Sequence, residues 1–137
     1  MIRWRLLVAE ALILLIAARL FVACLPLGRW RRLLGPVAQK AAGGSATAVD
    51  RLLASAVARA AARLGSGTKC LPRAITLFWM LSRRQRPAQL VIGVLPGIVR
   101  GSLDDLHAWV ECGSEIVIGA LDQPFQPLVR FDNRRGH

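Results

Sequence analysis

The sequence has few of the residues that build disulfide frameworks and metal sites. Its three cysteines, Cys24, Cys70 and Cys112, are irregularly spaced, and no two of them form a CxxC pair. An odd number of irregularly spaced cysteines argues against a disulfide framework and indicates reduced thiols, as in a cytosolic protein. Without a CxxC pair we expect no structural zinc, and we expect no other metal or cofactor.

Acidic residues are also scarce. The chain has 8 Asp and Glu against 19 Lys and Arg, almost all of them arginines, which gives a formal net charge of +11. Because guanidinium groups bind carboxylates and phosphates in a bidentate manner, this composition predicts an anionic partner. A GC-rich genome that writes surface positions as Arg and Ala would explain the same composition without a partner. The sequence lacks zinc-finger spacing and the aromatic signature of RNA-binding domains, so we expect no nucleic-acid binding.

Hydrophobic residues, by contrast, make up 54% of the 137 residues, which is enough for one packed domain. The surplus lies in the apolar run over residues 6–27, which is long enough to span a bilayer. Glu10 and Arg19 interrupt this run, and each charge at the centre of a span costs about 2.5–3.5 kcal/mol. No AxA-type cleavage site of a secretory signal follows it. We therefore favour a buried or partner-bound helix in a cytoplasmic protein over a true membrane span, with peripheral membrane association as a further alternative.

Hydrophobic periodicity predicts helices before Pro87 and strands after it. The strand-rich part ends at Gly119, beyond which the tail is rich in Pro, Arg and Asn and receives no strand. Helices followed by an antiparallel sheet indicate an α+β fold, in which residues 1–45 form a hydrophobic and basic helical segment and residues 46–137 form the core. The expected helices cover residues 4–24, 29–34, 47–64 and 71–84, and the expected strands cover residues 90–94, 106–112 and 115–118.

The third expected helix begins at a partial capping signal. The hydroxyl of Thr47 can accept a hydrogen bond from a first-turn N–H, and the carboxylate of Asp50 favours the positive end of the helix. A glycine-rich loop over residues 43–45 precedes it.

Cys70 stands at the beginning of the fourth expected helix, after a glycine-rich loop and beside Lys69. Pro72 fits the first turn, where a missing N–H costs nothing. A helix N-terminus and a nearby imidazole both favour the thiolate form of a cysteine, which is the nucleophilic form. The backbone N–H of Cys70 is also available to an oxyanion. The alternative is a buried cysteine that acts as a small hydrophobic residue.

His107 is the candidate base for such a nucleophile. The chain has two histidines, and the other, His137, is the last residue of the sequence. On the expected strand, His107 shares one face with Trp109 and Glu111, because side chains alternate along a strand. A cysteine followed later in the sequence by a histidine is the order of a Cys nucleophile with a base that folding brings near.

A third residue, a carboxylate or amide, usually fixes the imidazole tautomer. The candidates are Asp122, just past the last expected strand, and Glu111, on the same face as His107. Asp104 and Asp105 stand too close before the histidine to reach around it. We prefer Asp122.

Two stretches, CLPRAITLFWMLSRRQRPAQLVIGV from Cys70 and LHAWVECGSEIVI from Leu106, together resemble the transglutaminase-like core of lasso-peptide maturation proteases. These are the stand-alone B-type leader peptidases of bacterial lasso-peptide clusters. The N-terminal AEALILLIAARLFVACLPLGRWRRLLG is similar to the hydrophobic and basic opening segment of that family, so the resemblance covers nearly the whole chain.

The resemblance implies a papain- or transglutaminase-like core, with the nucleophile at a helix N-terminus packed on a small antiparallel sheet. Cys70 would match the nucleophile and His107 the base of a thioester mechanism. The substrate would be the leader of a ribosomally made precursor peptide. A small leader-recognition protein would deliver that peptide, and a separate ATP-dependent cyclase would close the macrolactam ring. The first helix would pack on the protease body or bind partner proteins.

The sequence departs from the family at one position. Members often carry an Asp about twelve residues after the histidine, where this chain has Gly119, so the acid would come from Asp122 or the site would work as a dyad. Two other functions stay open: an acyl transferase that uses the same thioester, and a membrane-associated basic scaffold without chemistry.

Overall fold

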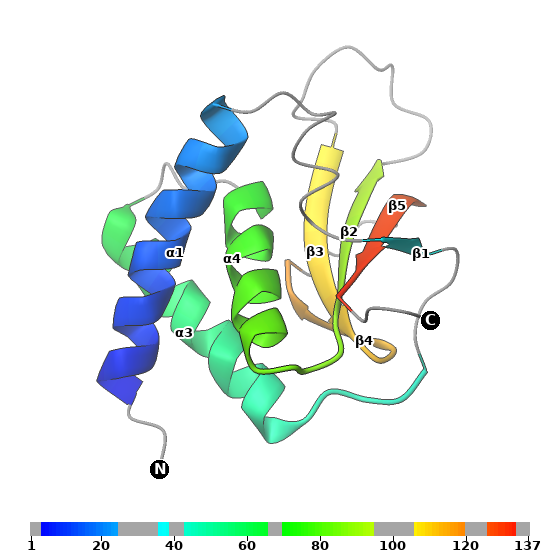
Figure 1. The fold of residues 1–137 in the computed structure, drawn as a ribbon, viewed down its shortest axis with the longest axis horizontal. Helices are drawn as coiled ribbons and strands as arrows, with labels where there is room; N and C mark the ends of the chain where they lie inside the picture. Colours follow the sequence, from blue (N-terminus) through cyan, green and yellow to red (C-terminus); the bar gives the residue numbers. More distant parts are fainter. Residues whose placement is uncertain are drawn as a thin grey trace.

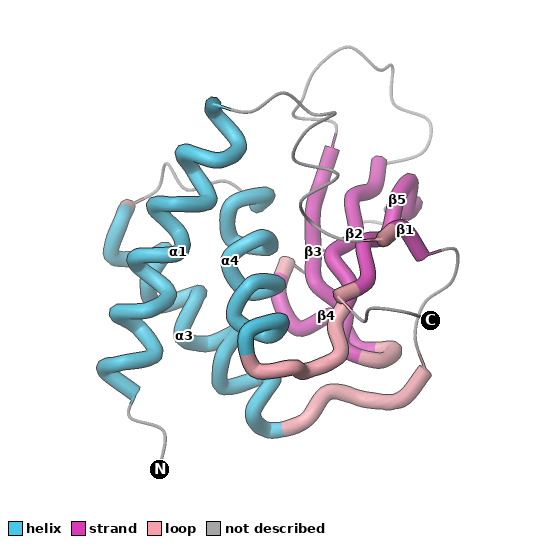
Figure 2. Tube along the Cα trace, in the orientation of Figure 1, coloured by secondary structure: helices cyan, strands magenta, loops and turns pink. Residues whose placement is uncertain are grey.

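The computed structural model describes residues 4–24, 36–38, 43–65, 70–94, 106–119 and 126–133. Within these ranges, helices and strands occupy separate sides of the molecule, as the α+β prediction required (Figures 1 and 2). The helices are α1 Trp4–Cys24, α3 Ala48–Leu64 and α4 Cys70–Arg83. The strands are β1 Val37–Ala38, β2 Gln89–Val94, β3 Leu106–Cys112, β4 Glu115–Ile118 and β5 Gln126–Asp132.

Most of the predicted elements are confirmed within one or two residues at each end. The first helix and the strands β3 and β4 have the predicted bounds, and Cys70 opens α4 as expected. The predicted basic helix over residues 29–34 lies outside the described residues.

The strands form one antiparallel sheet in the order β1-β5-β2-β3-β4. The prediction that no strand follows Gly119 is wrong, because β5 lies between β1 and β2 in the interior of the sheet. The strand was missed because of Pro127, since a residue without an N–H is not expected in an interior strand. The structure accommodates it at a register irregularity between Ile92 and Gly93 of the paired strand. Phe131 of β5 is fully buried in the hydrophobic core, and this burial stabilises the strand although polar residues stand near it in the sequence.

The hydrophobic core lies between the sheet and α4, which covers one sheet face. The helix is amphipathic, and its buried side includes a series of fully or almost fully covered side chains: Ile75, Leu77, Phe78, Met80 and Leu81. These pack with core residues from alternate positions of the strands, including Leu90, Ala108, Val110, Cys112 and Phe131. Burying one such Leu, Ile or Phe side chain stabilises the fold by about 1.5–3 kcal/mol.

Helix α1 lies on the far side of α3 and α4 from the sheet (Figure 1). Its buried residues recur at three and four positions and belong to the same core as the sheet residues: Leu7, Val8, Ala11, Leu15 and Ala18. Glu10 forms a two-pronged ion pair with Arg84, at 2.7 and 2.9 Å. Because Glu10 points at the protein, the charge that interrupts the apolar run is satisfied inside the fold.

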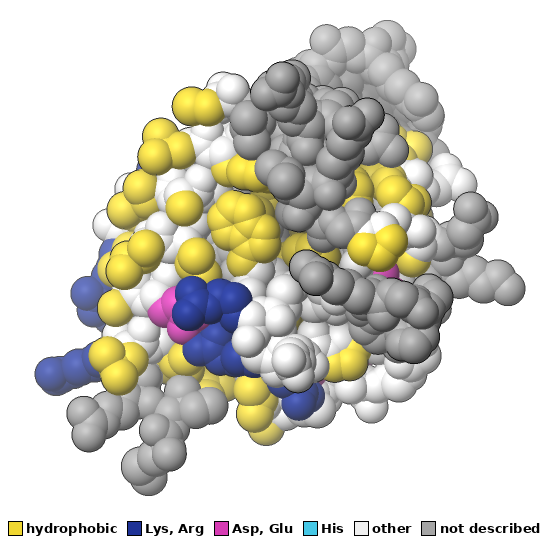
Figure 3. All heavy atoms as spheres, in the orientation of Figure 1, with side chains coloured by type: hydrophobic (Ala, Val, Ile, Leu, Met, Phe, Trp, Pro, Cys, Tyr) yellow, Lys and Arg dark blue, Asp and Glu magenta, His cyan; other side chains and the backbone are white. Residues whose placement is uncertain are grey.

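The opposite side of α1 is also apolar. By length and composition α1 could cross a membrane, although such a helix near the N-terminus is weak evidence of a span. Hydrophobic side chains are visible along the α1 edge of the molecule (Figure 3). The exposed residues of this stripe are spaced for one helix face: Leu6, Ile13, Ile16 and Leu20.

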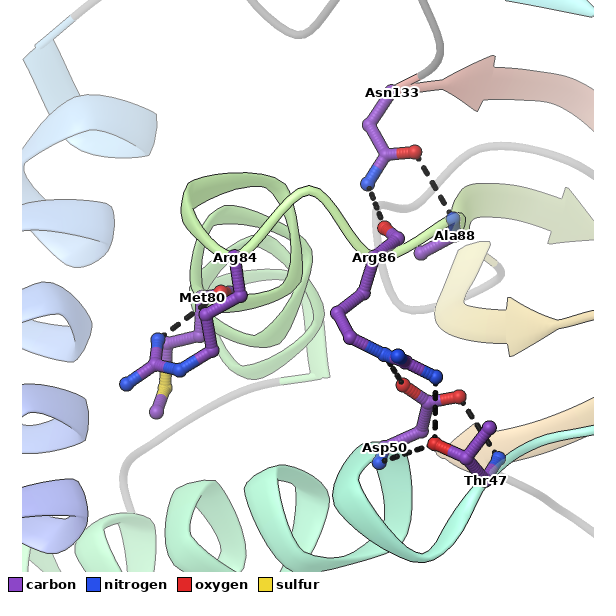
Figure 4. A network of polar contacts seen from close by, with 7 residues as sticks. All are labelled: Thr47, Asp50, Met80, Arg84, Arg86, Ala88 and Asn133. Atoms are coloured by element: carbon purple, nitrogen blue, oxygen red, sulfur yellow. Dashed lines mark hydrogen bonds and ion pairs between the residues drawn. The ribbon is translucent and has the colours of Figure 1, made fainter. Parts of the chain in front are cut away.

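The predicted cap of the third helix is confirmed as a full capping box (Figure 4). The Thr47 hydroxyl accepts from the Asp50 N–H at 3.2 Å, and the Asp50 carboxylate accepts from the Thr47 N–H at 2.9 Å. Arg86 adds a contact that the sequence did not reveal, since its guanidinium donates to both side chains, at 2.9 and 2.7 Å. Asn133 bonds the backbone of Arg86 and Ala88. These bonds tie the start of α3, the α4–β2 connection and the end of β5 together.

Candidate active site

Cys70 is the first residue of α4, and its free thiol is half-buried. At this position the thiol lies at the positive end of the helix dipole. The first-turn N–H groups have no acceptor within the helix, and Pro72 occupies the turn without losing a helical hydrogen bond. The local sequence therefore places a nucleophilic atom and first-turn backbone donors at one point.

The other two thiols lie in different surroundings. Cys112 is buried in the core, and burial raises the pKa of its thiol to about 12. A thiol with so high a pKa stays protonated and unreactive near neutral pH. Cys24 is exposed at the last residue of α1, a helix end that offers unpaired carbonyls and no first-turn N–H groups. Of the three thiols, Cys70 has the setting that suits a nucleophile.

Chain direction brings the beginning of α4 and the beginning of β3 to the same end of the molecule. Helix α4 connects through residues 84–88 to β2, so the two elements run in roughly opposite directions. Strand β3 is antiparallel to β2, with His107 opposite Gly93, and therefore runs in the direction of α4. The first turn of α4 and the first residues of β3 both lie at the upper end in Figure 1. The elements that carry Cys70 and His107 thus begin at the same end of the molecule, and the pairing of the two side chains stays a prediction.

The predicted division of β3 into two faces is confirmed. Ala108, Val110 and Cys112 point into the core shared with α4. His107 and Trp109 lie on the other face, where their rings stack with centroids 6.0 Å apart and planes 28° from parallel. The imidazole therefore leaves β3 on the face opposite the one that α4 covers, next to an aromatic platform, so it can reach the Cys70 thiol only around the end of the sheet at which both elements begin.

The absence of a side chain at Gly93 leaves space for the Trp109 ring. A Cβ at Gly93 would lie 2.6 Å from Cη2 and 2.9 Å from Cζ3 of the indole. Real Cβ atoms do not approach ring carbons so closely, so this position of β2 requires glycine while the indole keeps its place. The opening also lets the indole lie flat beside the ring of His107.

A buried polar chain anchors the indole from its other side. Trp109 Nε1 donates to Glu111 at 2.8 Å, and Arg130 of β5 donates to the other Glu111 oxygen, also at 2.8 Å. Arg130 further donates to Gln89 at 3.3 Å, and Gln89 donates to Asp132 at 3.2 Å. The role of Arg130 could not be predicted, because its partner Glu111 stands 19 positions away in the sequence, on a non-consecutive strand. Its role becomes visible with the position of β5.

These contacts decide against Glu111 as the third catalytic residue. Both of its oxygens are committed, one to the indole and one to Arg130. It also stands four residues along the strand from His107, which is about 13 Å at 3.3 Å per residue. The preferred candidate, Asp122, lies outside the described residues and stays a prediction, as do the catalytic roles of Cys70 and His107.

The described structure does contain a group that contacts the imidazole. His107 Nε2 is hydrogen-bonded to the backbone carbonyl of Gly119, the residue that follows β4. In the sequence, position 119 shows only that a side chain is missing. That its backbone carbonyl contacts the imidazole could not be predicted, because every residue has a carbonyl.

Among the described residues, no group of three or more His, Cys, Asp or Glu side chains is arranged to hold a metal ion. Within the described ranges, the groups at this end that could take part in chemistry include a thiol, an imidazole and backbone hydrogen-bonding groups.

The helices packed on a five-stranded antiparallel sheet are consistent with a transglutaminase-like core. The sequence matches the family described as the transglutaminase-like superfamily over residues 12–130, from within α1 to within β5. The chain belongs to this superfamily, whose members are generally cysteine peptidases or acyl transferases. Neither a curated protein nor a solved structure gives a significant match.

Proposed function

We propose that this protein is a cysteine peptidase that removes the leader from a ribosomally synthesised lasso-peptide precursor. Its nucleophile is Cys70 and its base is His107. The observation that carries the proposal is the position of these two residues at one end of a transglutaminase-like fold, the first at a helix N-terminus and the second at the start of the neighbouring strand. The lasso-peptide substrate is supported by the resemblance of the stretches around Cys70 and His107 to the B-type leader peptidases.

The reaction proceeds through a thioester. His107 takes the proton of the Cys70 thiol, and the sulfur attacks the carbonyl carbon of the peptide bond between leader and core. The resulting oxyanion is stabilised by backbone N–H groups of the first turn of α4. When the intermediate collapses, the C–N bond breaks and His107 gives its proton to the amine of the core peptide.

Water completes the cycle. His107 removes a proton from a water molecule, whose oxygen attacks the thioester carbonyl. The C–S bond breaks, the leader leaves as a carboxylic acid, and the proton returns to sulfur. Each turnover therefore consumes one water molecule and needs neither a metal nor a redox cofactor.

A small leader-recognition protein delivers the precursor, and an ATP-dependent cyclase closes the macrolactam ring after cleavage. All these steps take place in the cytoplasm, which fits the three free thiols. The net charge of +11 suits an acidic partner or leader. If so, leader-partner binding weakens between low and moderate salt, because exposed charges are screened.

Mass spectrometry of the products tests the function. The protein is incubated with a candidate precursor and its leader-binding protein, and cleavage yields two fragments whose masses sum to that of the precursor plus one water. Cys70→Ala is expected to abolish both fragments while binding of the leader is unchanged. Cys24→Ala, which removes an exposed thiol at a helix C-terminus, is the matched control and should cleave normally. Cleavage by the Cys70→Ala variant would refute the assignment.

The same experiment separates the acyl-transferase alternative, which the superfamily keeps open. Transfer to an amine gives one crosslinked species and releases ammonia from a glutamine side chain, whereas hydrolysis gives two fragments. The scaffold alternative makes a third prediction. It requires that iodoacetamide at mildly acidic pH label Cys70 no faster than Cys24, while a peptidase site favours Cys70.

A further inference from the structure

The hydrogen bond between His107 and Gly119 fixes which nitrogen of the imidazole carries the proton. A backbone carbonyl has lone pairs and no hydrogen, so in this bond Nε2 must be the donor. A neutral imidazole has one N–H, and when that hydrogen is on Nε2 the lone pair is on Nδ1. The carbonyl therefore selects the tautomer in which Nδ1 is the basic nitrogen.

The backbone around Gly119 is built to hold this carbonyl in place. Gly119 follows β4, which pairs with β3, so its carbonyl lies beside the strand that carries His107. Its φ of +87° lies in the left-handed region that favours glycine. A Cβ there would lie 2.8 Å from the Ala108 carbonyl oxygen and 3.0 Å from Trp109 Cβ, so no side chain fits while the loop keeps its path.

The imidazole is thus held from two directions. The Trp109 indole stacks against the ring and limits its tilt, and the carbonyl fixes its rotation about the Cβ–Cγ bond. When the ring accepts a second proton during catalysis, the same bond becomes charge-assisted and stronger.

We infer that the main-chain carbonyl of Gly119 is the positioning group of the base, in the role that a carboxylate or amide side chain usually has, and that Nδ1 of His107 takes the thiol proton. The inference rests on the proposed function, since it names a further group of the same site. It also predicts that the reaction does not require the carboxylate of Asp122.

Nitrogen NMR of the unsubstituted protein tests the tautomer without any substrate. The protein is labelled with ¹⁵N-histidine, and its two histidines are assigned with a His137→Gln variant. At a pH where the ring is neutral, the two-bond couplings to the carbon-bound ring protons identify the protonated nitrogen. Protonation at Nε2 supports the inference, and protonation at Nδ1 overturns it. Because no cleavage is measured, this result stands even if the proposed substrate is wrong.

Variants test the role in catalysis. Gly119→Ala must displace the carbonyl, so we expect kcat to fall roughly 10- to 100-fold with KM within about threefold, a part of the 10²–10⁴-fold that a positioned general base contributes. Gly44→Ala is the matched control, since Gly44 has a φ of +98°, a Cβ there meets nothing within 4 Å, and its carbonyl bonds the turn after β3. This control should lose stability without loss of kcat.

Asp122→Ala decides between the carbonyl and the carboxylate. Under the inference its kcat stays within about threefold of the unsubstituted protein, and its His107 keeps the proton on Nε2. A loss of kcat of a hundredfold or more in Asp122→Ala, or an unchanged kcat in a Gly119→Ala variant whose NMR shows the proton moved to Nδ1, would overturn it. If the unsubstituted protein cleaves no precursor, the proposed function fails while the tautomer measurement still decides the carbonyl's part.

Discussion

At the scale of single residues, the indole of Trp109 links the candidate base to a buried ion pair. One edge of the indole stacks on His107, and its N–H donates to Glu111, which in turn binds Arg130. The side chains of Glu111 and Arg130 are 11% and 16% exposed, so their charges interact in a medium far less polar than water. The pair thereby holds the platform on which the imidazole rests.

Arg130→Met is expected to lower the free energy of unfolding by about 3 kcal/mol, because it leaves the Glu111 carboxylate buried without a cation. Urea denaturation followed by circular dichroism measures the loss. The control is Arg51→Met, which breaks an ion pair of the same 2.8 Å length with Glu115 whose side chains are 57% and 39% exposed. That exposed pair should cost less than about 1 kcal/mol. Equal losses in the two variants would show that Arg130 contributes no more than a surface charge.

The parts of the site that the sequence reveals are side chains with distinctive chemistry. Cys70 could be placed at a helix N-terminus because Pro72 and the preceding glycines mark the boundary, and His107 could be placed on a strand because Trp109 and its neighbours alternate. The Gly119 carbonyl could not be predicted, since a backbone acceptor has no sequence signature. Arg130 could not be paired in advance, because its partner depends on which strands are neighbours.

At the scale of elements, α1 is joined by an ion pair to Arg84, the residue that directly follows α4, and this pair responds to pH. Hydrogen bonds from Arg84 lower the pKa of Glu10 from its usual 4.5, burial opposes the shift, and the charges of Arg84 and Arg83 add to the lowering. A carboxylate whose pKa is lower in the folded than in the unfolded state stabilises the fold above the unfolded value. That contribution is lost as the pH falls through the folded value.

We therefore expect the melting temperature to fall as the pH drops below about 5, with part of the loss due to Glu10. Glu10→Gln should cost about 2 kcal/mol at neutral pH, because it removes a charged hydrogen-bond pair, and should change less steeply between about pH 5 and 3. Asp50 contributes to the pH dependence of stability that remains in this variant. Burial raises the pKa of Asp50, but hydrogen bonds from Arg86 and Thr47 more than offset this and lower the pKa overall. Thermal melts at a series of pH values measure both effects. A variant with the same slope as the unsubstituted protein would exclude Glu10 as a contributor.

The local sequence pattern of each element explains why β5 was not predicted, whereas β3 and β4 were predicted with the observed bounds. Strand β3 alternates apolar core residues with His107, Trp109 and Glu111, which is a clear period of two. Strand β5 begins with three exposed residues, Gln126, Pro127 and Leu128, and its buried residue Phe131 stands near its end. Its pairing with β2 stabilises the extended conformation, because long-range contacts override a weak local preference for strand.

At the scale of the whole molecule, α1 connects the segment over residues 1–45 to the core over residues 46–137. That division stays a prediction, but its two parts share one hydrophobic core, to which α1 contributes Leu15 and four neighbours on the same face. Strand β1 of the first segment also pairs with β5 of the second. We expect a chain of residues 46–137 to lose the cooperative unfolding transition of the full protein, because the inner faces of α3 and α4 would be exposed.

Two single substitutions on α1 test whether this helix belongs to the protein body or to a bilayer. Leu15 is fully buried and Ile13, on the opposite side of the same helix, is 69% exposed. Leu15→Ala should lower the free energy of unfolding by about 3 kcal/mol, through lost apolar contact and the cavity left behind. Ile13→Ala should change it by less than about 0.5 kcal/mol. In a membrane span both side chains would face an apolar environment and the two variants would behave alike, so denaturation of the purified variants distinguishes the packed helix from the span.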